Sequence, residues 1–378
     1  MNATHWVTKA RALGPELAEG AGKRDVDGSF VRAGYALLRK HRFFSMGIPT
    51  ELGGGGATHA ELCDTTREIA RFCPSTALAF SMHSHLVAAT VWKHLRGEPG
   101  EQLLRRIAAQ QTVLLSTGAS DWIDSNGTME NVDGGYRVTA RKGFGSGGPA
   151  ADLIVTSARY EDAKAGPQVL HFAVPTTADG VRFADDWDTL GMRATGSNTV
   201  LFERVFVPEA AVSLRRPRGQ WHPVWSVVLT VAAPIYMSPY VGLAEAAREA
   251  ALASAVGKSD APHVAYLAGE LENALAETRL AWKGMIDNAK DYDFSPELER
   301  ANAALIGKTL CARAAKATVE KAMALAGGAG FFRASPLERM MRDVCAAAYH
   351  ALPEMRQIHF SGMVALGRDP ISGKAVSG

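Results

Sequence analysis

The residues of this chain that could act as general acids or bases in catalysis occur in two segments. One is residues 350–354 (HALPE), where His350 and Glu354 are the titratable groups. The other is the apolar stretch of residues 80–86, which carries His83 and His85. Histidine and glutamate commonly act as general acids and bases. We therefore take these four residues as candidates for catalysis or for the lining of a substrate pocket.

Each candidate also has a structural interpretation, and both interpretations stay open here. Glu354 follows Pro353, and an acid in the first turn of a helix interacts favourably with the helix dipole. His350 fits the carbonyl end of a helix for the same electrostatic reason. His83 and His85 lie among apolar residues, where a histidine that only fills the core is the commoner case.

Metal, disulfide and nucleic-acid chemistry receive no support from the composition. The four cysteines form no CxxC pair and no paired spacing with histidines, which predicts free thiols in a reducing, cytoplasmic compartment and no metal site. The 41 Lys and Arg residues nearly balance 39 Asp and Glu residues, so neither nucleic acid nor a membrane is expected as a partner. No secretory signal opens the chain.

Residues 143–148 (GFGSGG) match the GxGxxG pattern of dinucleotide-binding proteins. In those proteins the glycines open a helix whose N-terminus holds a pyrophosphate. Here the following residues, 149–156 (PAADLIVT), predict a strand instead. The match therefore implies no nicotinamide-binding domain.

The elements that must position these residues change type twice along the chain. Residues 1–111 are predicted to be helical, since apolar residues recur every three or four positions over residues 31–39 and 60–71, and Pro74 opens another helix. Between these helices, the glycines of residues 53–56 predict a loop. Residues 112–218 alternate with period two and carry many β-branched residues, which predicts a mainly antiparallel barrel or sandwich.

Residues 219–378 return to a helical pattern. Long Ala- and Leu-rich segments predict helices over residues 224–256, 262–290, 297–326 and 336–366, and four such helices form a bundle. Residues 220–244 contain no charge but are interrupted by prolines, so we expect a core helix of the bundle and no membrane span. The predicted fold class is α+β: an N-terminal helical domain, a middle β-barrel domain and a C-terminal four-helix bundle.

This order resembles the acyl-CoA dehydrogenase fold, and local motifs strengthen the resemblance. Residues 48–54 (IPTELGG) resemble the P-E-x-x-G-G turn of the family, and residues 190–197 (LGMRATGS) resemble its L-G-x-R-x-T-x-S segment. Residues 205–208 (VFVP) resemble the V-x-V-P that closes the β domain. Residues 327–330 (GGAG) and 337–343 (LERMMRD) resemble the G-G-x-G … E-x-x-x-R-D signature. The motifs span nearly the whole chain in the family's order.

The resemblance implies a bound flavin, with FAD expected and FMN as an alternative. Residues 144–146 (FGS) resemble the family's Trp-x-Thr, whose ring packs on the flavin and whose hydroxyl reaches N5. Residues 116–121 (STGASD) resemble a shortened form of its T-E-P-x-x-G-S-D strand. The implied cofactor-binding residues are Ser116, Thr117, Ser120, Phe144, Ser146, Gly327 and Gly328. The implied substrate-pocket residues are His83, His85 and Arg193.

The main functional prediction is α,β-dehydrogenation of an acyl-CoA with Glu354 as the base. The family's usual Glu-Gly-Thr motif is absent, and its position falls on Ala351 or Pro353, neither of which can accept a proton. The resemblance therefore leaves two alternatives: a two-component flavin monooxygenase, N-oxygenase or oxidase that uses His350, and a flavin-binding scaffold without catalysis. An electron-transfer protein or a flavin reductase is an expected partner, and self-association as a homodimer or homotetramer is expected from the family.

Overall fold

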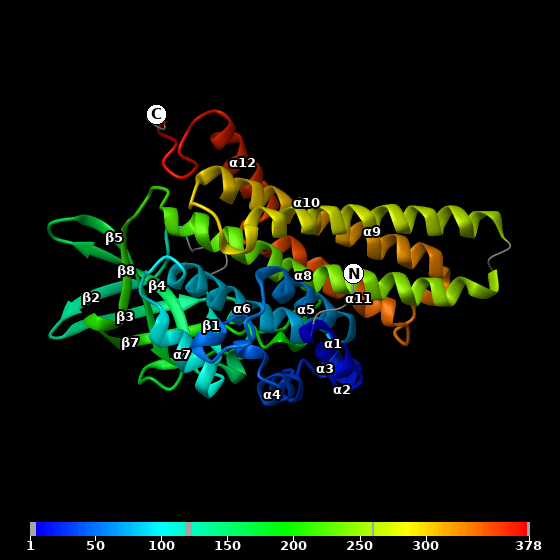
Figure 1. Ribbon diagram of the computed structural model, residues 1–378, viewed down its shortest axis with the longest axis horizontal. Helices are drawn as coiled ribbons and strands as arrows, with labels where there is room; N and C mark the ends of the chain where they lie inside the picture. Colours follow the sequence, from blue (N-terminus) through cyan, green and yellow to red (C-terminus); the bar gives the residue numbers. More distant parts are fainter. Residues whose placement is uncertain (1–4, 118–122, 259–260, 376–378) are drawn as a thin grey trace.

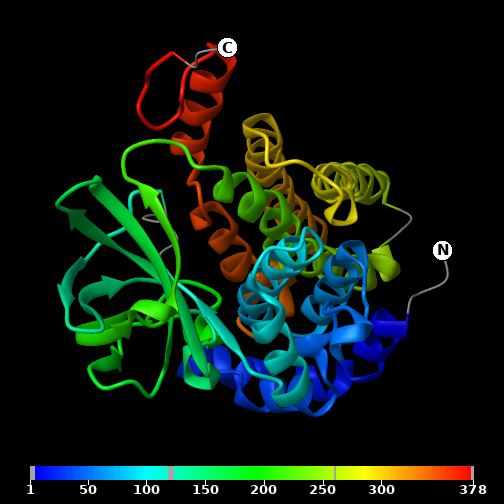
Figure 2. The same cartoon turned by 60° about the vertical axis from the view of Figure 1, so that its left-hand side comes forward.

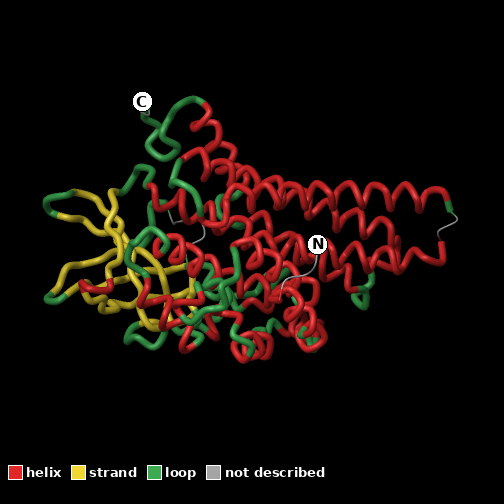
Figure 3. Tube along the Cα trace, viewed as in Figure 1, coloured by secondary structure: helices red, strands yellow, loops and turns green. Residues whose placement is uncertain are grey.

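The computed structural model describes residues 5–117, 123–258 and 261–375. Helices occupy the chain as far as Gln110, strands run from Leu114 to Pro217, and helices return at Pro223. Figure 1 shows the sheet at one end of the molecule, the long C-terminal helices extending from it, and the N-terminal helices packed below them. The same division is visible by element type in Figure 3. The predicted α+β fold class is confirmed, while domain boundaries after residues 111 and 218 stay predictions.

The N-terminal helices surround one buried helix that later forms a wall of the site. Thr58 caps α5 through its side-chain oxygen, which accepts the Glu61 N–H, while the Glu61 carboxylate accepts the Thr58 N–H. Pro74 begins α6, where its missing N–H costs no helical hydrogen bond. Helix α6 is buried along most of its length. Among the described residues of this part, the α-helices are α1 (His5–Ala12), α2 (Gly14–Ala18), α3 (Ala21–Asp27), α4 (Arg32–Lys40), α5 (His59–Phe72), α6 (Pro74–His94) and α7 (Glu101–Gln110).

The middle part is a single curved sheet with the order β6-β7-β3-β2-β4-β5-β8. Its pairs are antiparallel, as predicted, except that β1 and β2 both run parallel to β4. Side chains of β3 alternate between buried and exposed, so its inner face joins a second hydrophobic core. The strands are β1 (Leu114–Ser116), β2 (Thr128–Val132), β3 (Gly135–Lys142), β4 (Leu153–Asp162), β5 (Gly166–Pro175), β6 (Val181–Phe183), β7 (Val200–Pro208) and β8 (Val212–Pro217).

The C-terminal helices differ from the prediction in one place. Helices α8 (Pro223–Ala255), α9 (Pro262–Ala289) and α10 (Leu298–Ala326) match the expected segments, but the single helix predicted over residues 336–366 is wrong. The chain forms α11 (Pro336–Val344), a break in the α-helix over residues 345–353 that begins with a 3-10 turn at Cys345–Tyr349, and α12 (Glu354–Ala365). Pro353 explains why no α-helix continues from Tyr349 into α12, because proline supplies no N–H and its ring clashes with the carbonyl four residues earlier. Helix α12 packs against α10, where Phe360 and Leu305 belong to one small hydrophobic cluster, and Figure 2 shows α12 in red near the C-terminus.

Helix α8 is the central helix of this part. It is long and apolar enough to cross a membrane, yet 94% of its most apolar 18-residue window is buried inside the protein. It packs against α5, α6, α9 and α10. The contact with α5 is close, since a Cβ on Gly242 would lie 2.0 Å from the Arg67 carbonyl oxygen. The interpretation as a core helix is therefore supported, and the predicted cytoplasmic location stays a prediction.

Candidate active site

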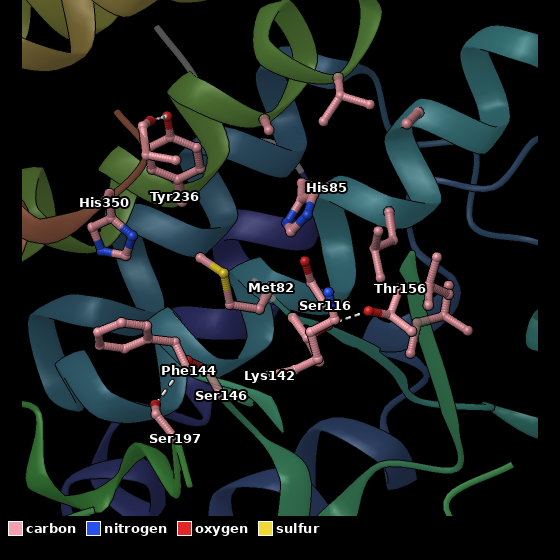
Figure 4. Close-up of a pocket in the computed structure, with 18 of the residues that line it drawn as sticks. Met82, His85, Ser116, Lys142, Phe144, Ser146, Thr156, Ser197, Tyr236 and His350 are labelled. Atoms are coloured by element: carbon pink, nitrogen blue, oxygen red, sulfur yellow. Dashed lines mark hydrogen bonds between the residues drawn. The ribbon is translucent and has the colours of Figure 1, made fainter. Parts of the chain in front are cut away.

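A cavity of about 1330 Å³ lies where the sheet, the helices α6 and α8, and the break before α12 meet. Figure 4 shows side chains from all of these elements pointing into it. We divide its lining into two surfaces. The hydroxyl wall comes from the sheet and its loops and comprises Ser116, Thr117, Ser146, Thr156 and Ser197. The apolar arm comes from α6 and α8 and comprises Met82, Leu86, Ala89, Val228, Leu229 and Ala232.

The hydroxyl wall is held together by short hydrogen bonds. The Oγ atoms of Ser146 and Ser197 lie 2.7 Å apart, and Thr117 Oγ1 donates to Thr156 Oγ1 over 2.7 Å. Ser116 ends β1, and Ser146 follows the end of β3. Hydroxyl groups both donate and accept, so this wall can bind a polar ring edge of either kind.

Phe144 presents an aromatic ring at the same edge of the cavity. Its backbone is left-handed, with a φ of 59°, and its side chain is 47% exposed in spite of being apolar. The ring meets Trp187 edge to face, with centroids 6.0 Å apart. Large apolar side chains that remain exposed inside a cavity are available to a flat ligand.

His350 also lines the cavity and lies in the break between α11 and α12. Its Nε2 lies 2.6 Å from the Tyr240 hydroxyl, and its ring stacks on Tyr236 at 5.1 Å. Two further hydrogen bonds fix this segment: Tyr236 donates to the Ala351 carbonyl over 3.0 Å, and Lys308 donates to the Leu352 carbonyl over 2.7 Å. Burial, assisted by the charge of Lys308, lowers the pKa of His350 to about 3, so the ring is neutral at physiological pH.

The two histidines of α6 have separate surroundings. His83 is buried behind the cavity lining: its Nδ1 accepts the Leu114 N–H at 2.9 Å and its Nε2 lies 2.8 Å from the Phe44 carbonyl. Both ring nitrogens are used, so His83 is a structural histidine and its assignment to the substrate pocket is corrected. His85 does line the cavity, with its Nδ1 3.2 Å from the Ser81 carbonyl.

Glu354 does not line the cavity. It begins α12, and its carboxylate pairs with Arg313, whose Nε donates to Oε2 over 3.1 Å. This guanidinium holds the pKa of Glu354 below its usual range, so the carboxylate is ionised and solvated. The structure therefore favours the first-turn, structural interpretation of Glu354 over a base in this cavity.

Three further predicted residues lie away from the cavity surface. Arg193 pairs with Asp188 at 2.7 Å and donates to the Asp25 and Thr189 carbonyls, so it fixes a loop rather than contacting a ligand in the cavity. Gly327 and Gly328 follow α10 on the exposed surface, and neither is among the lining residues. Ser120 lies outside the described residues. In contrast, Ser116, Thr117, Phe144 and Ser146 are brought together at the cavity as expected.

Several lining residues were not predicted from the sequence. Tyr236 and Tyr240 stand in α8, where only their apolar surroundings were evident. Lys142 ends β3 and is almost fully buried, with its Nζ donating to Ser125 Oγ and to the Asn126 carbonyl over 3.1 Å each. A lysine at an inward-facing position of an alternating strand was the available signal. Among the described lining residues, the only acid is Glu101, whose side chain is 51% exposed.

The fold and this cavity are those of a helix–sheet–helix enzyme with a large internal site, and sequence profiles identify the family. Residues 9–111 match the N-terminal domain of acyl-CoA dehydrogenase, residues 116–205 match the middle domain, and residues 235–354 match the C-terminal domain. The chain belongs to the acyl-CoA dehydrogenase family of flavin-dependent oxidoreductases.

Within this family, the chain is similar to several individual nitrososynthases and monooxygenases. The chain is 29% identical to the amino sugar nitrososynthase DnmZ of Streptomyces peucetius, over 88% of this chain and 85% of that protein. It is 29% identical to the probable FMNH2-dependent monooxygenase SfnC of Pseudomonas putida, over 72% and 70%. The structure of KijD3 in complex with FMN and a dTDP-linked keto sugar superimposes with a TM-score of 0.86 at 26% identity, covering 96% of this chain and 94% of KijD3.

Proposed function

We propose that this protein is a monooxygenase that uses reduced flavin and O2 to oxygenate a small organic molecule at a heteroatom. The observation that carries the proposal is the cavity lining. Dehydrogenation of an acyl-CoA needs a carboxylate base beside the substrate, and Glu101 is the only acid among the described lining residues. Glu101 stands at the exposed start of α7, while the interior carries neutral histidines, tyrosines, hydroxyls and the buried Lys142.

The residues present fit a flavin. A volume of about 1330 Å³ can hold the tricyclic ring of FMN together with a substrate of similar size. Phe144 and Trp187 offer aromatic surface, and the hydroxyl wall offers hydrogen bonds to a polar ring edge. We infer that Ser116, Thr117, Phe144 and Ser146 bind the cofactor, as FMN or FAD.

The flavin supplies the two electrons that reduce one atom of O2 to water. For an amine the balanced reaction is RNH2 + O2 + FMNH2 → RNHOH + H2O + FMN, and a sulfur substrate gains one oxygen in the same way. The protein excludes water with the apolar arm and keeps His350 neutral through burial. Tyr240 holds the His350 ring in place, so that the ring can exchange a hydrogen bond with the reacting atoms.

Reduced flavin must reach this chain from outside. Residues 143–148, which match GxGxxG, run from β3 into a short 3-10 turn and β4 and open no dinucleotide-binding helix. We therefore infer that a separate flavin reductase supplies FMNH2. Association of this chain into a homodimer or homotetramer stays a prediction.

The test is anaerobic loading with FMNH2, followed by mixing with O2 in a stopped-flow instrument. We expect the protein to slow the reoxidation of FMNH2 at least tenfold relative to free FMNH2, because a monooxygenase must hold oxygen until substrate arrives. Reoxidation at the rate of free flavin would contradict the proposal.

A parallel experiment examines the dehydrogenase alternative. A panel of acyl-CoAs is added anaerobically to the protein loaded with oxidised flavin, and we expect no bleaching of the flavin absorbance. Bleaching that disappears in Glu354→Gln would restore acyl-CoA dehydrogenation and would place Glu354 in the reaction. A protein that binds flavin but responds in neither experiment would be a scaffold.

A further inference from the structure

His85 leaves one ring nitrogen directed into the cavity. Its Nδ1 lies 3.2 Å from the Ser81 carbonyl, one helical turn earlier on α6. A carbonyl oxygen only accepts hydrogen bonds, so Nδ1 must carry the proton. In the neutral ring, Nε2 then carries a lone pair. Because Nδ1 turns back to its own helix, Nε2 points away from it, and among the described residues Nε2 has no hydrogen-bond partner.

The cavity beside this lone pair offers the apolar arm together with Ser116, which lies next to His85 in Figure 4. Met82 lies one turn before His85 on the same face of α6, Leu86 follows His85, and Val228, Leu229 and Ala232 come from α8, which packs against α6. A ligand that fills this arm displaces water from Nε2. A buried acceptor that loses its water and gains no other hydrogen-bond donor makes the free energy of binding less favourable by about 1–3 kcal/mol. The arm therefore favours a ligand that is mainly apolar and returns one hydrogen bond to Nε2.

We propose that His85 Nε2 accepts a hydrogen bond from the substrate, and that the substrate is an apolar molecule with an N–H group, such as a primary or secondary amine. The inference rests on the proposed function, since it names the substrate class of the same site. The bond orients an amine so that its nitrogen lone pair faces away from His85 and remains free for oxygenation. A thioether or thiophene lacks the N–H and leaves Nε2 unpaired.

Two probes of nearly equal size and shape test this inference. Indole carries an N–H where benzothiophene carries sulfur. We expect the full-length protein loaded with oxidised FMN to bind indole about tenfold more tightly than benzothiophene, measured by isothermal titration calorimetry. Equal affinities, tighter binding of benzothiophene, or no binding of either probe would overturn the proposal.

Variants identify the residue responsible. His85→Phe keeps an aromatic ring but removes the acceptor, so the preference for indole should disappear. Met82→Leu changes the shape of the same arm without removing an acceptor, so the tenfold preference should persist. If Met82→Leu abolishes the preference as His85→Phe does, packing and not the hydrogen bond causes it, and the proposal is wrong. The same titrations on flavin-free protein separate this outcome from a failure of flavin binding, which would contradict the proposed function instead.

Discussion

His83 and His85 are separated by one residue and yet perform different tasks. Each residue turns an α-helix by about 100°, so two positions place the side chains on nearly opposite faces. One face of α6 meets Phe44 and Leu114, and there His83 uses both ring nitrogens. The other face meets the cavity, and there His85 uses only one. The surroundings, rather than the residue type, therefore decide which histidine can contact a ligand.

At the same scale, the hydroxyl of Tyr240 is expected to control His350. Tyr240→Phe removes only the group that bonds His350 Nε2. We expect the reoxidation of bound FMNH2 to become about tenfold faster, which corresponds to the loss of one hydrogen bond of roughly 1–1.5 kcal/mol. Stopped-flow absorbance measures this rate.

Tyr349→Phe is the matched control for that experiment. Tyr349 also lines the cavity, but its side chain is 69% exposed and its hydroxyl bonds none of the described residues. The control should behave as the unaltered protein does. An unchanged rate in Tyr240→Phe would show that the hydrogen bond to His350 has no part in handling oxygen.

At the scale of elements, the contact between α5 and α8 depends on a single glycine. Gly242→Ala improves helix propensity by about 1 kcal/mol, but the new Cβ would lie 2.0 Å from the Arg67 carbonyl oxygen. Because that oxygen belongs to backbone, the helices must move apart. We expect a net loss of about 2 kcal/mol in the free energy of unfolding, measured by urea denaturation.

Gly269→Ala in α9 is the control for this contact. No atom lies within 4 Å of its added Cβ, so the variant should be neutral or more stable by up to about 1 kcal/mol. A similar loss of stability in both variants would mean that the close approach of α5 and α8 is not the cause.

Asp343 links α11 to the loop before β7, and its stability contribution depends on pH. Its carboxylate accepts the Met192 N–H, and burial raises its pKa from an ordinary 3.8 to about 6. Below about pH 4 the acid is protonated in both folded and unfolded chains. Between about pH 4 and pH 6 the carboxyl group ionises in the unfolded chain but stays protonated in the folded chain. The folded state therefore loses stability as the pH rises through this window to the folded pKa of about 6.

Asp343→Asn should therefore stabilise the protein at pH 8 and change little at pH 4. Asparagine keeps a carbonyl for the Met192 N–H and removes the buried charge, and the expected gain is at most about 3 kcal/mol. Urea denaturation at the two pH values measures it. Asp343→Ala also removes the charge but leaves the N–H without its acceptor, so it should be less stable than Asp343→Asn at both pH values. Equal effects of Asn at pH 4 and pH 8 would show that the carboxylate titrates normally.

At the scale of the whole molecule, the cavity joins parts that are distant in the sequence, so a ligand in it should stabilise the entire fold. At a concentration of FMN one hundred times its Kd, we expect about 2.7 kcal/mol of added stability. Thermal unfolding with and without FMN measures this. Quenching of tryptophan fluorescence gives the affinity, since Trp187 and Trp225 line the cavity.

Phe144→Ala should weaken FMN binding and reduce the stabilisation. Phe206→Ala is the control, because Phe206 is 38% exposed and is not among the lining residues. Equal affinities of the two variants for FMN would show that Phe144 does not contribute to FMN binding.

The order of helical and β segments could be predicted because periodicity is a local property of the chain. The break over residues 345–353 could not, because the segment around Ala346 and Ala347 favours a helix and only Pro353 opposes it. The sequence also favours neither the catalytic nor the structural interpretation of Glu354. Only the position of Arg313, 41 residues earlier, separates them. Tyr240 and His350 are likewise 110 residues apart, so their hydrogen bond has no local signal.

The hydroxyl wall and the apolar arm belong to different structural units, the first to the sheet and its loops and the second to two helices. Mutations can therefore accumulate on one surface while the other is conserved. Substitutions at Met82, Leu86, Val228 and Leu229 could change which substrates bind. Such substitutions leave the residues of the hydroxyl wall, and therefore cofactor binding, unaltered. For laboratory evolution, these four positions form a compact library, and saturating them together should diversify substrate choice faster than random mutagenesis of the whole gene.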